Sequence, residues 1–417
     1  MRIAFLVKFF PTLSETFILN QITGLIDRGH EVDIFASYRG DTTNMHPDVH
    51  KYELLKRTHY SISVPSNIFI RICKAACLTA AGIWKKPIAI VRALNFFKYG
   101  REAVSLRLLY KVLAHIDSKP YDIIQCHFGP KGILAAELRE VGAITGRIVT
   151  TFHGYDVSRY LCDRGNQVYD GLFHKGDLFL AISELGSRNL SDLGCPIQKL
   201  KIHHMGIDSQ RFAFMPRDVP AEADILILTV ARLVEKKGIE YGIRAIAKLK
   251  QRYHRIKYKI IGDGPLRKHL QKLVQELGLE NTVELVGWRL QDEIINELHS
   301  ACILLAPSIT ASNGDKEGVP VVMMEAMATG LPVISTLHSG IPGLVEDGVS
   351  GFLVPERDTD ALAEKLGYLI EHPDIWSRMG RSGRDQIEGN YDINKLNDKL
   401  VSIYQGLIED DRVHQNN

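Results

Sequence analysis

Short apolar runs alternate with helical stretches along the whole chain, and this alternation limits the possible folds more than any other feature. Ten runs of three to six residues are continuously apolar or nearly so. Such runs are typical of parallel strands that are buried on both faces and connected by helices. The chain is therefore predicted to have an α/β fold with doubly wound parallel sheets. The expected strands are residues 3–7, 32–36, 123–127, 148–152, 178–182, 225–230, 258–261, 283–286, 303–306 and 333–335.

The length of 417 residues is too great for one ordinary core and favours two domains. A hydrophobic content of 45% supplies enough apolar material for both. Residues 217–224, RDVPAEAD, are polar, contain a proline and separate apolar blocks, so the boundary is expected there. A final helix, roughly residues 394–408, fits either domain by its pattern.

Positive charge is concentrated in residues 56–111, which carry eleven Lys or Arg and one acid and so a net charge of +10. Apolar stretches lie between these cations, and Trp84, Phe96 and Phe97 supply aromatic anchors. This composition is typical of a surface that contacts anionic lipid headgroups. Two amphipathic helices packed on the first domain are the alternative. Nucleic acid is not expected as a partner, because no recognition motif accompanies the charge.

The N-terminus, MRIAFLVKFF, has a short apolar run without a small-residue cleavage site, so it predicts a buried strand and not a signal peptide. No run of about 18 uncharged apolar residues predicts a membrane span. The six cysteines lack the spacing of a zinc site and are expected to be reduced thiols of a cytoplasmic protein.

Glu317 and Glu325 flank the expected start of a helix near Val321, in EGVPVVMMEAMATGLPVIST. If the whole segment is helical, they lie about 12 Å apart. The amides and dipole of a helix N-terminus attract an anion, and carboxylates accept hydrogen bonds from vicinal hydroxyls. These properties suit a diphosphate with a sugar at one end and a ribose at the other. The alternative is a capping acid followed by a solvated helix face.

A second polar stretch, LTVARLVEKKGIEYGI (228–243), places cations after an apolar strand. Arg232 directly follows the strand and Lys237 precedes Gly238. Ligands of open α/β sheets bind at the carboxyl ends of strands, so these cations are candidates to neutralise a diphosphate leaving group without a metal. Two surface cations on a loop are the alternative, and Lys236 is interpreted in that way.

Two loops of the first half supply further candidates. His153 follows an expected strand in TFHGYD (151–156), and the adjacent Gly154 permits a close backbone approach; a purely structural histidine is the alternative. In PTLSETF (11–17), Ser14 is expected to cap the first helix. Ser14, Glu15 and Thr16 are together the candidate acceptor-binding residues.

Two patterns are set aside. Asp358-Thr359-Asp360 has the form of a metal-binding motif but directly precedes a helical segment, where Asp is expected as a cap, so no metal site is predicted. Gly262-Asp263-Gly264-Pro265 lacks the spaced glycines of a dinucleotide site and predicts a tight turn.

Taken together, these motifs resemble those of the retaining glycosyltransferases of family 4. The resemblance covers nearly the whole chain. It is carried by the Glu317/Glu325 pair, R-L-x-x-x-K-G (232–238), TFHGYD, GDGPLR (262–267), ELVGW (284–288), GIDSQRF (206–212) and SGIPGLVEDGVSGFLVP (339–355). More narrowly, FPTLSETFILNQI (10–22), HFGPKG (127–132) and the segment 306–342 resemble exopolysaccharide transferases of the colanic acid and amylovoran type.

The resemblance implies a GT-B fold, in which two Rossmann-like domains face a deep cleft. Residues 1–216 would bind the acceptor, residues 217–393 would bind the nucleotide sugar, and a helix of about residues 394–417 would cross back to the first domain.

The resemblance also implies roles for individual residues. Glu317 would contact the donor sugar near the reacting centre, Glu325 the ribose, and His153 the sugar or its phosphate. Arg232 and Lys237 would hold the diphosphate. The other donor-binding candidates are Gly287, Trp288 and Arg289 beside the base, and Gly318, Val319, Pro320 and Val321 at the helix start.

The loop of residues 8–16 departs from the family, because it lacks the glycine pair that many relatives carry there. An acceptor role is therefore favoured for this loop over phosphate contact.

The predicted reaction is metal-independent transfer of a hexosyl unit, with retention and without a cofactor, from a UDP- or GDP-linked sugar. The expected acceptor is a polyprenyl-diphosphate-linked oligosaccharide at the inner face of the cytoplasmic membrane, where bacterial exopolysaccharide or surface polysaccharide is made. A nucleotide-sugar epimerase and a non-catalytic glycan- or lipid-binding scaffold are the alternatives.

Overall fold

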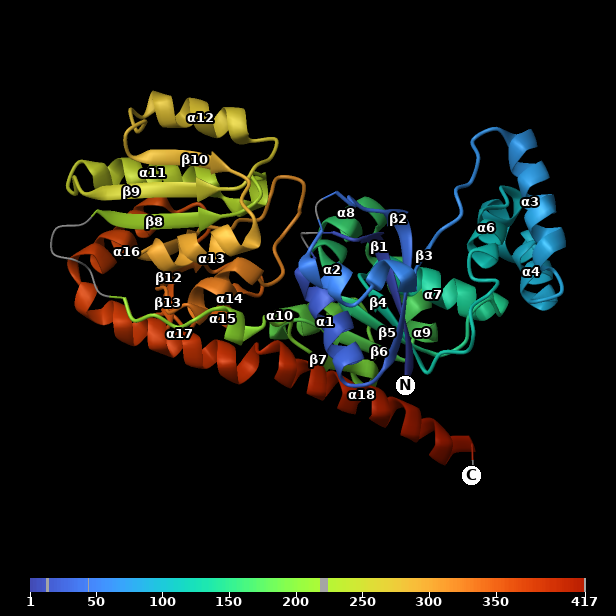
Figure 1. Ribbon diagram of the computed structural model, residues 1–417. Helices are drawn as coiled ribbons and strands as arrows, with labels where there is room; N and C mark the ends of the chain where they lie inside the picture. Colours follow the sequence, from blue (N-terminus) through green and yellow to red (C-terminus); the bar gives the residue numbers. More distant parts are fainter. Residues whose placement is uncertain (13–14, 44, 218–223, 416–417) are drawn as a thin grey trace.

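The computed structural model describes residues 1–12, 15–43, 45–217 and 224–415, with side chains described through residue 409, and contains two parallel β-sheets (Figure 1). The first sheet has the strand order β3-β2-β1-β4-β5-β6-β7. Its strands are β1 (Arg2–Phe10), β2 (Glu31–Arg39), β3 (Thr58–Tyr60), β4 (Ile123–His127), β5 (Arg147–Phe152), β6 (Leu178–Ala181) and β7 (Leu200–Ile202).

The second sheet has the order β10-β9-β8-β11-β12-β13. Its strands are β8 (Ile225–Val230), β9 (Ile256–Ile261), β10 (Val283–Gly287), β11 (Ile303–Ala306), β12 (Val333–Thr336) and β13 (Gly351–Val354). The ten predicted strands and the doubly wound α/β fold are confirmed. The three strands that were not predicted, β3, β7 and β13, are edge strands of three or four residues. β3 (THY) and β7 (LKI) lack a continuous apolar run, whereas β13 (GFLV) has a short one that was missed.

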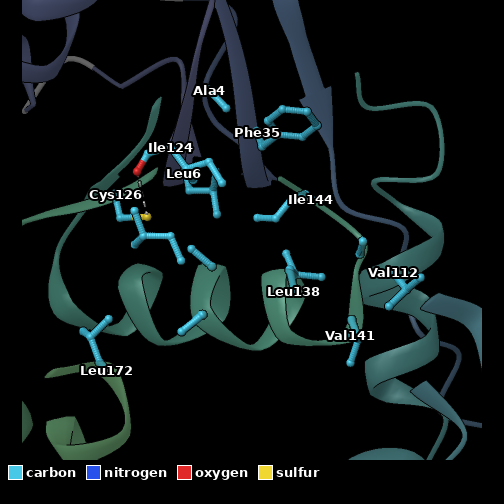
Figure 2. Close-up of a cluster of buried hydrophobic side chains, with 14 of the residues drawn as sticks. Ala4, Leu6, Phe35, Val112, Ile124, Cys126, Leu138, Val141, Ile144 and Leu172 are labelled. Atoms are coloured by element: carbon cyan, nitrogen blue, oxygen red, sulfur yellow. Dashed lines mark hydrogen bonds between the residues drawn. The ribbon is translucent and has the colours of Figure 1, made fainter. Parts of the chain in front are cut away.

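Helices cover both faces of the first sheet. They are α1 (Thr16–Asp27), α2 (Pro47–Lys51), α3 (Ile68–Gly82), α4 (Pro87–Ala93), α5 (Phe96–Val104), α6 (Arg107–Leu113), α7 (Gly129–Val141), α8 (Arg159–Arg164), α9 (Asp170–Lys175) and α10 (Glu184–Asp192). Figure 2 shows Leu138 of α7 below Leu6 and Ile124 of the strands, all at most 2% exposed. Beside them the Cys126 thiol donates to the Ile124 carbonyl at 3.9 Å. Burial of each such leucine stabilises the sheet–helix contact by about 2 kcal/mol.

The helices of the second half are α11 (Ile239–Lys250), α12 (Arg267–Glu276), α13 (Gln291–Ser300), α14 (Val321–Ala328), α15 (Ile341–Leu344), α16 (Thr359–Glu371) and α17 (Trp376–Asn390). Met323, Met324 and Met327 of α14 are fully buried, and α14 is apolar on nearly all sides. This composition is expected for a helix enclosed by β11, β12 and α17. The short helix that carries Glu325 is therefore rigidly held.

The last helix, α18 (Ile393–Gln415), runs from the second half along the first (Figure 1). Leu400 and Tyr404 are buried in the hydrophobic cluster of β1 and α1. The Tyr404 hydroxyl donates to Gln125 Oε1 at 2.7 Å on the first sheet. The boundary expected at residues 217–224 includes residues 218–223, which lie outside the described residues.

The helices α3 to α6 lie on the side of the first sheet that faces away from the second sheet (Figure 1). Asn67 caps α3 by accepting hydrogen bonds from the amides of Phe69 and Ile70. Large apolar side chains of this region remain in solvent, with Trp84 89% and Phe97 88% exposed. Among the helices that the structure describes, none has both the length and the apolar character needed to cross a membrane.

Candidate active site

The loops that follow β5 and β11 meet where the two sheets face one another. His153 and Gly154 follow β5, while Glu317 and Gly318 precede α14. A Cβ atom on Gly154 would lie 2.6 Å from Gly318 N and 2.7 Å from the Glu317 carbonyl carbon. Only glycine permits this close approach of the two loops. The tertiary structure thus brings together the loops that carry His153 and Glu317, which are 164 positions apart in the sequence.

Two ammonium groups hold the buried Glu317 carboxylate. Lys237 Nζ lies 3.0 Å from Glu317 Oε2, and Lys236 Nζ lies 3.6 Å from Oε1. Burial disfavours the charged form, but the attraction of Lys237 and Lys236 outweighs it and lowers the pKa of Glu317. Interpreting Lys236 as a surface cation was wrong: its side chain is 12% exposed and also pairs with Asp315 Oδ2 at 3.2 Å.

The backbone of Glu317 is clamped as well. His338 Nε2 accepts a hydrogen bond from the Glu317 amide at 3.1 Å, and His338 Nδ1 lies 2.6 Å from Glu356 Oε1. The Ser339 hydroxyl donates to the Glu317 carbonyl at 2.6 Å. Sequence reasoning missed His338 and Glu356, although His338 lies within the family-like segment 306–342, because neither residue belonged to a pattern that pointed to chemistry.

Glu325 lies on α14, half-buried, eight positions after Glu317. Burial raises its pKa to about 7, against the opposing attraction of Arg211. The helix begins at Val321, as predicted, but residues 317–320 are not helical. The spacing of about 12 Å is therefore not supported, since it assumed the helical rise over all eight residues.

The start of α14 presents backbone more than side chains. Val319 and Pro320 are buried, and Val319 packs into a hydrophobic cluster with Met323. The amides of Val321 and Val322 open the helix, where amides have no acceptor within the helix itself. A ligand at this point would meet N–H groups and the positive end of the helix dipole.

Arg232 follows β8 at the carboxyl edge of the second sheet, and its side chain is exposed. Its guanidinium makes no hydrogen bond or ion pair with another described residue, although the backbone carbonyl accepts from the Val234 amide at 2.9 Å. Glu15 of the first half is close enough to interact: burial raises the pKa of Glu15, and the charges of Lys8 and Arg232 partly oppose that rise. Glu15 directly precedes α1 without using its side chain as a cap, and Thr16 opens the helix. Ser14 lies outside the described residues.

Gly287, Trp288 and Arg289 lie at and after the end of β10. Gly287 has φ +93°, which favours glycine. Trp288 is 60% exposed, and Arg289 Nε lies 3.6 Å from Glu293 Oε1. The indole is thus open to solvent.

His153 is buried and neutral. Burial lowers its pKa to about 3, and the rings of Phe17 and Phe128 pack against it at 4.9 and 4.5 Å between centroids. His153 Nε2 lies 3.1 Å from Nδ1 of the equally buried His127. His153 Nδ1 is buried without a hydrogen-bond partner among the described residues.

A groove of about 340 Å³ opens beside the contact between the two loops. It is lined by Gly154, Val157, Ser158, Leu161, Cys162, Asn166, Asn189, Gly314, Lys316, Glu317 and Ser339. Both halves contribute to its walls, with amide and hydroxyl groups beside apolar ones. Such a mixed lining suits a polyol, which offers both hydroxyls and C–H faces.

Across the residues with described side chains, no three His, Cys, Asp or Glu residues gather as a metal site. Asp358, set aside as a helix cap, accepts a hydrogen bond from the Ala361 amide at 2.9 Å at the start of α16, which confirms the cap. The turn of residues 262–265 approaches the first loop of the second sheet closely: a Cβ on Gly262 would lie 2.0 Å from the Ala231 carbonyl oxygen.

Two known families match successive parts of the chain. Glycosyltransferase Family 4 matches residues 14–211, and Glycosyl transferases group 1 matches residues 211–386. The chain is 41% identical to the proposed colanic acid biosynthesis glycosyltransferase WcaL of Escherichia coli (strain K12), over 98% of this chain and all of that protein. It is 42% identical to the amylovoran biosynthesis glycosyltransferase AmsK of Erwinia amylovora with the same coverage.

Among solved structures, Anabaena Alr3699/HepE in complex with UDP-glucose aligns with a TM-score of 0.72 at 17% identity, covering 97% of this chain and all of that one. A glycosyltransferase from Rickettsia africae aligns with a TM-score of 0.69 at 19% identity, covering 98% of each. At these identities the alignments show a shared fold.

Proposed function

We propose that this chain, which belongs to the family 4 and group 1 glycosyltransferases, moves a hexosyl unit from a UDP- or GDP-linked sugar with retention of the anomeric configuration. Its fold is GT-B, and glycosyl transfer is the activity of its family. Residues 217–393 bind the donor in this proposal. Residues 1–216, together with the last helix, bind the acceptor.

The observation that carries the proposal is the buried, doubly paired Glu317 carboxylate at the meeting point of both halves. Its Oε1 has no hydrogen-bond donor among the described residues, so it offers a free acceptor to sugar hydroxyls. In the proposal Glu325 accepts from the ribose, and residues 287–289 border the base.

The leaving diphosphate is held by Arg232, by Lys237 and by the first amides of α14. The Arg232 guanidinium is unpaired among the described residues and is therefore available. The three hydrogens of the Lys237 ammonium allow it to hold Glu317 and a phosphate oxygen together. As the bond between the anomeric carbon and the diphosphate oxygen breaks, the acceptor hydroxyl attacks on the same face. Its proton passes to the departing diphosphate. These cations provide the charge stabilisation that a metal supplies in other enzymes, so the transfer is proposed to need no metal.

The acceptor in this proposal is a polyprenyl-diphosphate-linked oligosaccharide used for bacterial exopolysaccharide. The names of the two relatives that are 41% and 42% identical concern colanic acid and amylovoran biosynthesis, and they support that assignment. The loop that includes Glu15 and Thr16 would contact the acceptor, since Glu15 lies across from Arg232.

The protein is proposed to bind the inner face of the cytoplasmic membrane through residues 56–111. The exposed Phe69 and Phe97 lie on α3 and α5, and Trp84 lies in the turn between α3 and α4. All three belong to the segment that carries the concentrated positive charge, as an interfacial surface requires. Flotation with vesicles that contain anionic lipid tests this. Replacing Trp84 and Phe97 by Ser should abolish binding. Ile197→Ser, at a residue 75% exposed but outside this segment, should not. Equal flotation of all three proteins would refute this surface.

Incubating the protein with a mixture of nucleotide sugars and a lipid-linked acceptor extract, followed by mass spectrometry, tests the transfer. NMR of the product shows whether the anomeric configuration is retained. Arg232→Ala and Glu317→Ala should each lower the rate by about 10²–10³-fold, as loss of one charge-stabilising contact does elsewhere. Near-normal turnover in both folded variants, or conversion of the nucleotide sugar without an acceptor, would contradict the proposal.

A further inference from the structure

Gln21, His127 and His153 form a series of hydrogen bonds that ends one residue before Gly154, which lines the groove beside Glu317. Gln21 Oε1 lies 3.1 Å from His127 Nε2, and His127 Nδ1 lies 3.1 Å from His153 Nε2. Gln21 belongs to α1, His127 ends β4 and His153 follows β5. All three side chains are buried, so bulk water does not interrupt the chain.

Both imidazoles are neutral. Burial lowers the pKa of His127 well below its usual value and that of His153 to about 3. A neutral imidazole carries one N–H donor and one lone pair. The partner of one ring nitrogen therefore decides what the other nitrogen can do.

The donor and acceptor in each of these hydrogen bonds are set by Gln21, because its side-chain carbonyl oxygen can only accept. His127 Nε2 must then donate, so His127 Nδ1 is the lone pair and accepts from His153 Nε2. His153 Nδ1 consequently carries a lone pair and no proton. The opposite direction would bury an unpartnered N–H at His153 Nδ1, which native proteins avoid more strictly than an unpartnered acceptor.

Aromatic packing holds both rings in place. His127 stacks on Phe5 at 5.8 Å and meets Phe17 at 5.9 Å between centroids. His153 lies against Phe17 and Phe128. Exchange of the two ring nitrogens by rotation would disturb this close packing, so the tautomer is set by the hydrogen bonds.

We infer that Gln21 and His127 are positioning residues that fix the tautomer of His153, so that its Nδ1 can only accept a hydrogen bond. This inference rests on the proposed function, in which a nucleotide sugar occupies the site. The group that meets Nδ1 is then a sugar hydroxyl and not the diphosphate, because ionised phosphate oxygens have no hydrogen to donate. Glu317 Oε1 is a second buried acceptor without a hydrogen bond, on the loop that touches Gly154. The two acceptors together select a ligand with hydroxyl donors.

The tautomers are measured by ¹⁵N NMR of the histidine rings in the full chain without ligand. In the wild type, His153 should be protonated at Nε2 only. Gln21→Met removes the acceptor at similar volume and should produce a population protonated at Nδ1, whereas Gln21→Glu keeps an oxygen acceptor and the wild-type tautomer. Asn20→Met is the matched control, because Asn20 lies on the same helix but takes no part in the hydrogen bonds between Gln21, His127 and His153. Protonated Nδ1 in the wild type, or an unchanged tautomer in Gln21→Met, would overturn the inference.

A ligand experiment assigns the partner of Nδ1. With the natural donor, Gln21→Met should lower kcat/KM about tenfold, since the wrong tautomer loses one hydrogen bond. With one deoxy analogue of the donor sugar, wild type and Gln21→Met should agree within about twofold, which identifies the hydroxyl. If the tautomer shifts but kcat/KM is unchanged for every donor, the sugar contact is disproved. If the wild type turns over no nucleotide sugar while the NMR result holds, the proposed function fails and the tautomer assignment stands.

Discussion

The contact between Gly154 and Gly318 should be needed for catalysis and not for folding. Gly154→Ala places a methyl carbon 2.6 Å from Gly318 N, 2.7 Å from the Glu317 carbonyl carbon and 2.9 Å from its oxygen. All three atoms are backbone atoms, and His338 and Ser339 clamp the same residue, so no side chain can move aside. The overlap is therefore relieved by separating the two halves.

Overpacking of this kind costs about 1–3 kcal/mol. Because 1.4 kcal/mol corresponds to a factor of ten, kcat/KM for glycosyl transfer should fall about 5- to 150-fold in Gly154→Ala. The melting temperature should change little, because both cores keep their packing. Small-angle X-ray scattering should show a larger radius of gyration than in the wild type.

Gly171→Ala is the matched control, since a Cβ at Gly171 in α9 meets no atom within 4 Å and alanine favours a helix. Its activity and scattering should equal those of the wild type. The reasoning would be refuted by a Gly154→Ala enzyme with full kcat/KM and unchanged scattering.

Three further predictions follow from single residues. The raised pKa of Glu325, about 7, means that the folded state binds more protons than the unfolded state, so stability is fully present below about pH 4.5 and falls as the pH rises to 7. In urea titrations, Glu325→Gln should therefore raise the free energy of unfolding by about 1–3 kcal/mol at pH 8 and by less at pH 5. An equal gain at both pH values would contradict the burial argument. Asp358→Ala should lower stability by about 1 kcal/mol through loss of the bond to Ala361, with unchanged activity in the presence and absence of EDTA; loss of activity would restore the metal interpretation. His338→Phe leaves the buried Glu317 amide without an acceptor and should lower kcat/KM about tenfold, whereas His338→Gln, which can still accept, should recover part of the loss; equal activity of the two variants would disprove the clamp.

The α/β fold was predictable because its signal is local. A parallel strand buried on both faces reads as a continuous apolar run, and ten of the strands have one. The start of α14 at Val321 and the Asp358 cap were predictable for the same reason, since Pro, Gly and Asp act on neighbouring residues. The edge strands β3 and β7 lack such a run and escaped prediction, while the short apolar run of the edge strand β13 was missed.

The candidate site, like the fold, was predictable from the sequence only in part. The sequence alone singled out Arg232, Lys237 and His153, because charged or polar residues after apolar strands lie at the ligand edge of an α/β sheet. It singled out Glu317 because this acid precedes the expected start of a helix, where an anion can bind. What Glu317 and His153 touch was decided only by the tertiary structure.

The pairing of Lys236 with Glu317, the bond of His127 to His153 and the contact of Gly154 with Gly318 join residues 26 to 164 positions apart. Such contacts depend on how strands are ordered in a sheet and how the two sheets face one another. Those arrangements result from packing many side chains at once, and no local pattern encodes them.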